Sequence, residues 1–261
     1  HERLHLRGDL VGGIRPGEVW AVAGWTSSGK SIWVDMLADT ASAAGARVHL
    51  YLTEMTIVQR GLRLIARRTG IPMGALRKRT LTRSQREHAL KAIERLPYAA
   101  SIVTDWTAKQ VAADIRASRT NVAIVDLLHG FHYQDERELS AIVTEFAKAA
   151  SSDASGTDGA AIVLVCQLND GQMRDSRSAR RPKPGMHSLK GASWIKQRCD
   201  VVVFVWLEDD DDGRPTTQGE VWIAKNRNGG LGDTVEVALD PTTIAFRERT
   251  TAHETSTGRA A

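Results

Sequence analysis

Cysteine is scarce in this sequence, because Cys166 and Cys199 are the only two among 261 residues. A disulfide framework is therefore excluded as the main source of stability, and a chain of this length can bury a substantial core without one. Each cysteine adjoins an apolar run, so we expect two buried thiols in a reducing compartment.

Long apolar runs are also missing, which argues against a transmembrane helix, and residues 1–5 lack the hydrophobic stretch of a signal peptide. The sequence therefore predicts a cytoplasmic protein with no membrane partner. Because it begins at His1 and not at a methionine, we expect further residues to have preceded it.

A strong overall charge is absent as well, since the formal net charge is only +4. Its distribution is uneven, however, because residues 167–198 carry an excess of six positive charges. A polyanionic partner fits that segment.

A phosphate-binding pattern is present at residues 24–31, where GWTSSGKS fits G-x-x-x-x-G-K-[ST] between an apolar run and a helical pattern. Glycines let the loop curl so that backbone N–H groups point at a polyphosphate, and the following helix adds its positive end. Lys30 supplies a charge for the phosphates and Ser31 a hydroxyl for Mg²⁺. We expect the whole loop to bind nucleotide: Gly24, Trp25, Thr26, Ser27, Ser28, Gly29, Lys30 and Ser31.

Strand and helix patterns alternate along the chain, which predicts an α/β fold with a mostly parallel twisted sheet and helices on both faces. Apolar strand patterns lie at 19–23, 47–53, 101–103, 122–126, 161–165 and 200–207, and helical patterns at 56–68, 83–96, 107–119, 138–150 and 189–198. Later strands at 220–225, 234–239 and 243–247 predict an antiparallel C-terminal hairpin extension. Residues 168–187 are predicted to form a mobile loop, and the acidic run 208–212 a solvated hairpin tip. The expected division is one ATPase domain over 1–249 and a disordered tail over 250–261.

Three polar residues follow predicted strands, and the carboxyl ends of parallel strands meet at one ligand-binding edge. Asp126 closes an apolar strand as a Walker B aspartate does, and would hold Mg²⁺ together with Ser31. Glu54 is placed to polarise an attacking water, and Gln167 to hydrogen-bond the terminal phosphate. A capping Asp, a solvated Glu and a surface Gln are the alternatives.

The motifs, taken in order, resemble those of the C-terminal RecA-like motor domain of DnaB-type replicative helicases. The resemblance covers residues 12–247 and rests on GWTSSGKS, Thr53-Glu54-Met55, IVDLLHG, the run 166–169, the run 191–202 and the run 224–229. It implies a RecA-like P-loop NTPase that uses ATP and Mg²⁺. Lys30, Glu54 and Gln167 would be catalytic, and Ser31 and Asp126 would bind the metal.

The resemblance also implies an assembly. Lys225 and Arg227 are similar to the basic pair that reaches a neighbouring subunit's nucleotide, so they would complete the catalytic set in trans. The active unit would then be a homo-oligomer, a hexameric ring as in that family. Two exposed charges at a strand end are the alternative.

The segments after Asp126 and Gln167 correspond to the two loops that line the family's central channel, which passes single-stranded DNA. The second is the basic segment, and its DNA-binding candidates are Arg174, Arg177, Arg180, Arg181 and Lys183. A solvated loop is the alternative. The first, residues 127–133, departs from the family's usual run, and its His129 and His132 lack a third residue for a metal site.

The first hypothesis is therefore a DNA motor that hydrolyses ATP between subunits, translocates on single-stranded DNA and unwinds duplex. The alternatives are a RecA-like DNA-binding ATPase without unwinding activity, as in recombination, plasmid or phage factors, and a regulatory protein that uses nucleotide to assemble. Glu54 and Arg227 discriminate, because an assembly protein needs neither.

Overall fold

The computed structural model describes residues 13–94, 96–151, 159–169, 180–189, 192–229 and 234–249. The predicted tail at 250–261 and the candidates Arg174 and Arg177 lie outside these ranges.

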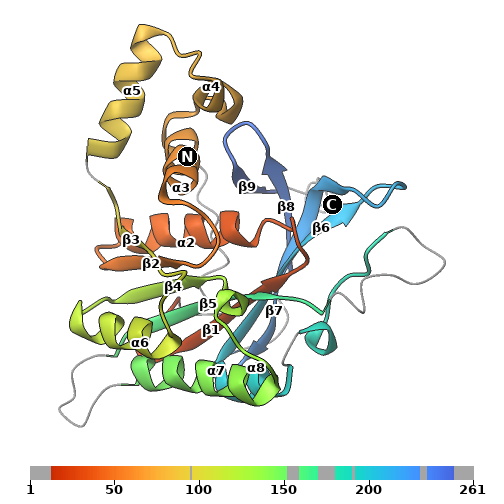
Figure 1. Ribbon diagram of the computed structural model, residues 1–261. Helices are drawn as coiled ribbons and strands as arrows, with labels where there is room; N and C mark the ends of the chain where they lie inside the picture. The colour runs from red at the N-terminus through yellow and green to blue at the C-terminus, as the bar shows by residue number, and fades with distance from the viewer. Residues whose placement is uncertain are drawn as a thin grey trace, which may run out of the picture.

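A nine-stranded sheet forms the centre of the molecule, in the order β3-β2-β4-β5-β1-β6-β7-β8-β9 (Figure 1). The strands are β1 (Val19–Gly24), β2 (Val48–Leu52), β3 (Ala99–Ile102), β4 (Val122–Asp126), β5 (Ala161–Gln167), β6 (Val201–Asp209), β7 (Pro215–Asn226), β8 (Thr234–Asp240) and β9 (Ala245–Glu248). Strands β1 to β6 pair in parallel, and β7 to β9 continue the sheet antiparallel. The predicted α/β class, with its antiparallel extension, is confirmed.

Helices cover both faces of this sheet (Figure 1). They are α2 (Lys30–Ala43), α3 (Ile57–Thr69), α4 (Met73–Lys78), α5 (Arg83–Glu94), α6 (Ala108–Ala117), α7 (Glu136–Ala150) and α8 (Ala192–Arg198), with 3-10 turns η1 (Leu128–Gly130) and η3 (Met186–Ser188). Helix α2 lies on one face, α6, α7 and α8 lie on the other, and the α3–α5 group projects beyond the sheet.

Two buried clusters explain this layering, because side chains alternate between the faces of a strand. In β1, Ala21 and Ala23 join the cluster with α6 and α7, whereas Trp20 and Val22 join the cluster with α2. Both faces of the central strands are therefore apolar, as expected of strands covered on both sides.

Local signals in the sequence fix the helix that follows β2. The Thr56 side chain accepts a hydrogen bond from Gln59 N, and the Gln59 side chain accepts one from Thr56 N, which forms a capping box at the start of α3. The helix ends at Gly70, whose φ of 70° suits glycine. This cap sets where the arginines of α3 fall relative to the P-loop.

Some local structure differs from the sequence-based expectation. Helix α4 and the turn η1 were not predicted, because short elements carry too few residues for a periodic pattern. The acidic run is only partly a solvated tip, since β6 continues to Asp209, which is buried, and the tip begins at Asp210. Within the segment expected to be a mobile loop, 186–188 form η3, and Leu168 pairs with Leu189.

One simpler expectation agrees with the structure. Cys166 and Cys199 are both buried free thiols, and burial raises the pKa of Cys199 to about 12. Among the described residues, no helix is long and apolar enough to cross a bilayer.

Candidate nucleotide site

The P-loop connects β1 to α2 in a shape that two glycines permit. A Cβ at Gly24 would lie 2.2 Å from the Val205 carbonyl oxygen and 2.3 Å from Ser28 Oγ. Gly29 has a φ of 86°, and a Cβ there would lie 2.5 Å from the Phe246 ring. The loop backbone is thus packed so closely that neither position accepts a side chain without movement.

Lys30 is the buried cation of this loop. Its Nζ donates hydrogen bonds to the carbonyl oxygens of Gly24, at 2.9 Å, and Trp25, at 2.7 Å. Burial lowers the pKa of Lys30 from 10.5 to about 8, although the carboxylates of Asp126 and Glu54 oppose the shift. A cavity of about 360 Å³ opens beside it, lined by Ser27, Gly29, Lys30, Ser31, Ile32, Arg63 and Leu239.

The expected strand-end residues meet at this edge of the sheet. Asp126 ends β4, and its carbonyl accepts a hydrogen bond from Thr53 N, so Glu54 follows directly beside it. Gln167 ends β5 and pairs in register with Gly24. The negative charges of Asp126 and Glu54 both act to raise the pKa of Lys30, so these carboxylates lie within electrostatic reach of its ammonium group.

Gln167 joins two neighbouring loops. Its side-chain amide donates to Thr26 Oγ1 at 3.1 Å, and its backbone N–H donates to His129 Nδ1 at 3.1 Å. His129 therefore contacts the end of β5. The described residues contain no cluster of three or more His, Cys, Asp or Glu side chains that could hold a metal ion by themselves.

An arginine row on α3 was missed by sequence reasoning. Arg60, Arg63 and Arg67 lie three and four residues apart, facing Asp35 and Asp39 of α2. Arg60 also forms an ion pair with Asp126, and Arg63 lines the cavity beside Lys30. The spacing of the charges was visible in the sequence, but their partner helix was not.

Lys225 and Arg227 lie away from the P-loop of their own chain. Asn226 pairs with Val201 at the start of β6, whereas the P-loop follows the end of β1, which runs parallel to β6. Lys225 Nζ donates to the carbonyl oxygens of Lys196 and Cys199. Arg227 forms an ion pair with Asp200 at 2.9 Å, and its side chain is half exposed.

The described part of the basic segment lies against the β6–β7 hairpin. Arg181 forms an ion pair with Asp209, with Nε to Oδ2 at 2.8 Å. Arg180 pairs with Asp211, and Lys183 pairs with Glu220. We call these three pairs the hairpin clamp.

The hairpin clamp is attached to the P-loop. Trp25 Nε1 donates to the Pro182 carbonyl at 2.9 Å, and Arg181 Nη1 donates to the Thr26 carbonyl at 2.6 Å. Lys183 Nζ lies 4.8 Å from the centre of the Trp222 ring, a cation–π contact. The segment after β5 thus contacts the loop that follows β1.

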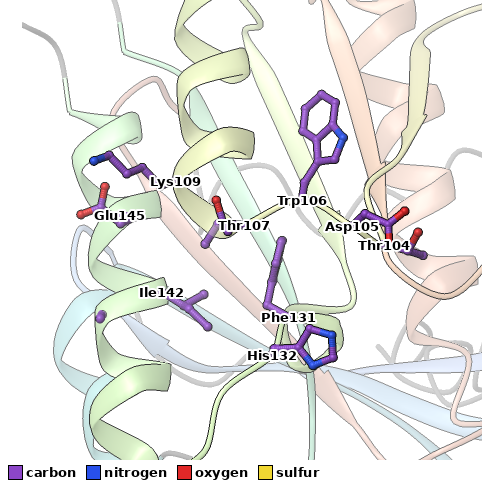
Figure 2. Close-up of a pocket in the computed structure, with 11 residues that line it drawn as sticks. Thr104, Asp105, Trp106, Thr107, Lys109, Phe131, His132, Ile142 and Glu145 are labelled. Carbon is purple, nitrogen blue, oxygen red and sulfur yellow. The ribbon is translucent and has the colours of Figure 1, made fainter.

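A second cavity, of about 480 Å³, lies beside the segment that follows β4. Figure 2 shows Trp106, Thr107, Phe131 and His132 around it, between the start of α6 and the turn after η1. It shares no lining residue with the cavity beside Lys30. His132, the second histidine of the expected first loop, therefore faces this cavity.

The residues at the P-loop fit a Mg²⁺-bound triphosphate. Ser28 Oγ is buried and has no hydrogen-bond partner in the described part of the chain. The loop backbone is free of side chains at Gly24 and Gly29, and Lys30, Ser31 and Asp126 supply the ammonium, hydroxyl and carboxylate that such a ligand requires.

The family model described as DnaB-like helicase C terminal domain matches residues 5–248. The chain belongs to this family. No curated protein sequence matches the chain.

Solved structures agree with the DnaB-like fold. One, described as an ATPase domain, aligns with a TM-score of 0.76 at 19% identity, over 92% of this chain and 87% of that one. Another, "The Structure Of A DnaB-Like Replicative Helicase And Its Interactions With Primase", aligns with a TM-score of 0.73 at 19% identity, over 94% of this chain and 61% of that one. At this identity the likeness shows the fold, and it confirms the expected RecA-like helicase-domain architecture.

Within this DnaB-like chain the sequence-predicted residues fall into two groups. Lys30, Ser31, Glu54, Asp126 and Gln167 gather at the P-loop edge. Lys225 and Arg227 lie at the opposite ends of the strands, near the start of β6.

Proposed function

We propose that this chain is an ATP-hydrolysing motor of DNA replication, which translocates on single-stranded DNA and unwinds duplex in the cytoplasm. Membership of the DnaB-like family supports a helicase-type ATPase. The observation that carries the proposal is that Asp126, Glu54 and Gln167 lie at the strand ends next to the P-loop, whose Lys30 lines a cavity of about 360 Å³.

The P-loop residues hold the nucleotide. The loop N–H groups and Ser28 Oγ donate to phosphate oxygens, and Lys30 exchanges its two carbonyl acceptors for the phosphates. Ser31 and Asp126 would hold Mg²⁺, which would supply positive charge to neutralise the charge that develops on the transferred phosphoryl group. Because a phosphate favours the ammonium form, nucleotide binding raises the depressed pKa of Lys30.

Glu54 and Gln167 perform the remaining steps in the same subunit. Glu54 orients and polarises the attacking water as a general base. Gln167 hydrogen-bonds the terminal phosphate and transmits its loss to Thr26 and His129, which it already contacts.

Lys225 and Arg227 act on another subunit's nucleotide. They lie at the strand ends opposite to the P-loop of their own chain. Within one chain they therefore cannot reach the phosphates that this P-loop binds. A neighbouring copy supplies the phosphates, and in a closed ring every site receives such a cation; we propose a hexameric ring, by resemblance to the family.

DNA phosphates replace the carboxylates of the two outer pairs of the hairpin clamp, Asp211 and Glu220, while the buried Arg181–Asp209 pair anchors the segment. Arg180, Arg181 and Lys183 already bind oxygen anions, so their side chains are presented in a form that suits a phosphate backbone. Such contacts need no base readout and suit a motor that passes any sequence. Arg174 and Arg177, which lie outside the described residues, are proposed to bind DNA as well.

The test is ATP hydrolysis with and without single-stranded DNA. Glu54→Gln should lower turnover by about 10²-fold or more while nucleotide affinity stays within about twofold. Glu87→Gln, on the exposed surface of α5, is the matched control and should be neutral. Normal turnover in Glu54→Gln would reject the assignment.

Arg227→Ala tests the assembly. Alone it should lower turnover by about 10³-fold. Mixed with Glu54→Gln, it should regain activity, because some interfaces then combine an intact Glu54 with an intact Arg227. A mixture as inactive as its components would contradict action in trans.

Two further measurements separate the alternatives. Strand displacement on a forked duplex distinguishes a motor from a DNA-binding ATPase without unwinding activity. Turnover that DNA does not stimulate would favour nucleotide-dependent assembly.

A further inference from the structure

Arg60 of α3 lies directly behind the proposed metal site. Its Nη2 pairs with Asp126 Oδ2, and its Nη1 pairs with Asp35 Oδ1 and donates to the Ser31 carbonyl at 3.0 Å. One planar guanidinium thus contacts both residues expected to hold Mg²⁺. The side chain of Arg60 is 5% exposed, so water does not loosen these contacts.

The two buried carboxylates of Asp35 and Asp126 require the positive charge of Arg60 between them. Asp35 and Asp126 are both buried, and each has Arg60 as a partner. Burial raises the pKa of Asp35, the charges of Arg60 and Arg67 lower it, and the charge of Asp126 raises it. Without Arg60, the two buried carboxylates would lose the ion-pair partner that they share, which is strongly destabilising.

We propose that Arg60 is a positioning residue for the divalent cation: it fixes Asp126 through Oδ2 and the turn at Ser31 through its carbonyl. This inference rests on the nucleotide site of the proposed function. Arg60 touches neither phosphate nor metal, and acts through the two residues that do. Groups that orient ligands in this way typically change metal affinity by about 10- to 100-fold when altered.

Arg67 provides a matched comparison on the same helix. It is buried to the same degree, at 6% exposed, and pairs with Asp35 and Asp39, but it has no contact with Asp126 or Ser31. A purely structural role for the cluster would make Arg60 and Arg67 equivalent. A positioning role makes only Arg60 matter for the cation.

The experiment measures binding of a non-hydrolysable ATP analogue by calorimetry, across a Mg²⁺ titration and in EDTA. Arg60→Lys keeps the charge but cannot bridge three oxygens with one planar group. It should raise the Mg²⁺ concentration at half-maximal binding by about tenfold, with affinity in EDTA unchanged within about twofold. Arg67→Lys should leave the Mg²⁺ midpoint within about twofold of the wild type.

Equal shifts in both variants, or an unchanged midpoint in Arg60→Lys, would overturn the proposal. If Arg60→Lys does not fold, the double variant Asp35→Leu/Arg60→Leu removes the ion pair together and should show the same midpoint shift. Wild-type protein that binds the analogue with Mg²⁺ but lacks DNA-stimulated hydrolysis would contradict the proposed motor and leave the role of Arg60 intact.

Discussion

Two sets of ion pairs flank the P-loop, and they differ chiefly in burial. In the cluster between α2, α3 and β4, Arg60 is 5% exposed and Asp35 is 1% exposed. In the hairpin clamp, Arg180 is 57% exposed and Asp211 is 93% exposed. Buried pairs are strongly destabilising to break, whereas exposed pairs contribute little and exchange easily. The same chemistry can therefore hold the proposed metal ligand Asp126 in place on one side and release a proposed DNA-binding side chain on the other.

Arg181 and Asp209 lie between these extremes. Arg181 is 11% exposed, and the Asp209 side chain is fully buried. This pair fixes the described part of the basic segment to the β6–β7 hairpin. The other two pairs, Arg180–Asp211 and Lys183–Glu220, are more exposed and contribute less. The comparison predicts a graded series of effects.

The largest effect is expected where the buried cluster loses a shared carboxylate. Asp35→Ala leaves Arg60 and Arg67 with one buried partner fewer, and should reduce the free energy of unfolding by about 3–5 kcal/mol. Urea denaturation measures it. A loss below about 1 kcal/mol would show that the cluster behaves like a surface pair.

The next largest effect is expected at Asp209. Asp209→Asn should lower the free energy of unfolding by about 1.5–3 kcal/mol at neutral pH. Burial alone would raise the pKa of Asp209, but hydrogen bonds from Arg181 and its charge outweigh burial and hold the pKa below 3.8. Folded Asp209 then binds fewer protons than unfolded Asp209, so its contribution is present at neutral pH and is lost as the pH falls through this lowered pKa.

Unfolding in urea at several pH values checks that sign. The stability difference between the wild type and Asp209→Asn should shrink as the pH falls from about 5 to 3. A constant difference over this range would contradict the assignment.

A smaller effect is expected at Lys30, whose buried ammonium titrates unlike any arginine nearby. With a pKa of about 8, only about a tenth of the free protein carries the charge at pH 9, so nucleotide affinity should fall about tenfold between pH 7 and pH 9. Lys30→Arg stays charged and should bind with a flat pH profile, even if more weakly. Equal pH dependence in both would contradict the prediction.

The smallest effect on stability is expected in the exposed pairs. Asp211→Asn/Glu220→Gln should change the free energy of unfolding by at most about 0.5 kcal/mol per pair. Because Arg180 and Lys183 lose competing anions, affinity for a fluorescent thymidine oligonucleotide should rise and depend more steeply on salt. Anisotropy at several salt concentrations measures both, with Glu87→Gln as the neutral control.

The sequence predicted much of the fold and less of the site's surroundings. The P-loop and Asp126 carry their own local signals, because a glycine turn and a carboxylate after an apolar run are readable from neighbouring residues. The bridge from Arg60 to Asp126 joins residues 66 positions apart, so no local pattern contains it. The same reason explains Asp209: its run of acids indicates solvent exposure, and only the approach of Arg181 makes its burial possible.

Thr26 receives contacts from two directions. Its hydroxyl accepts a hydrogen bond from Gln167, and its carbonyl accepts one from Arg181. In the proposed motor, the side chain that senses the terminal phosphate and a side chain that binds DNA thus donate hydrogen bonds to the same residue. Loss of the phosphate could therefore shift the DNA-binding segment through Thr26 alone, without a chain of intermediate contacts.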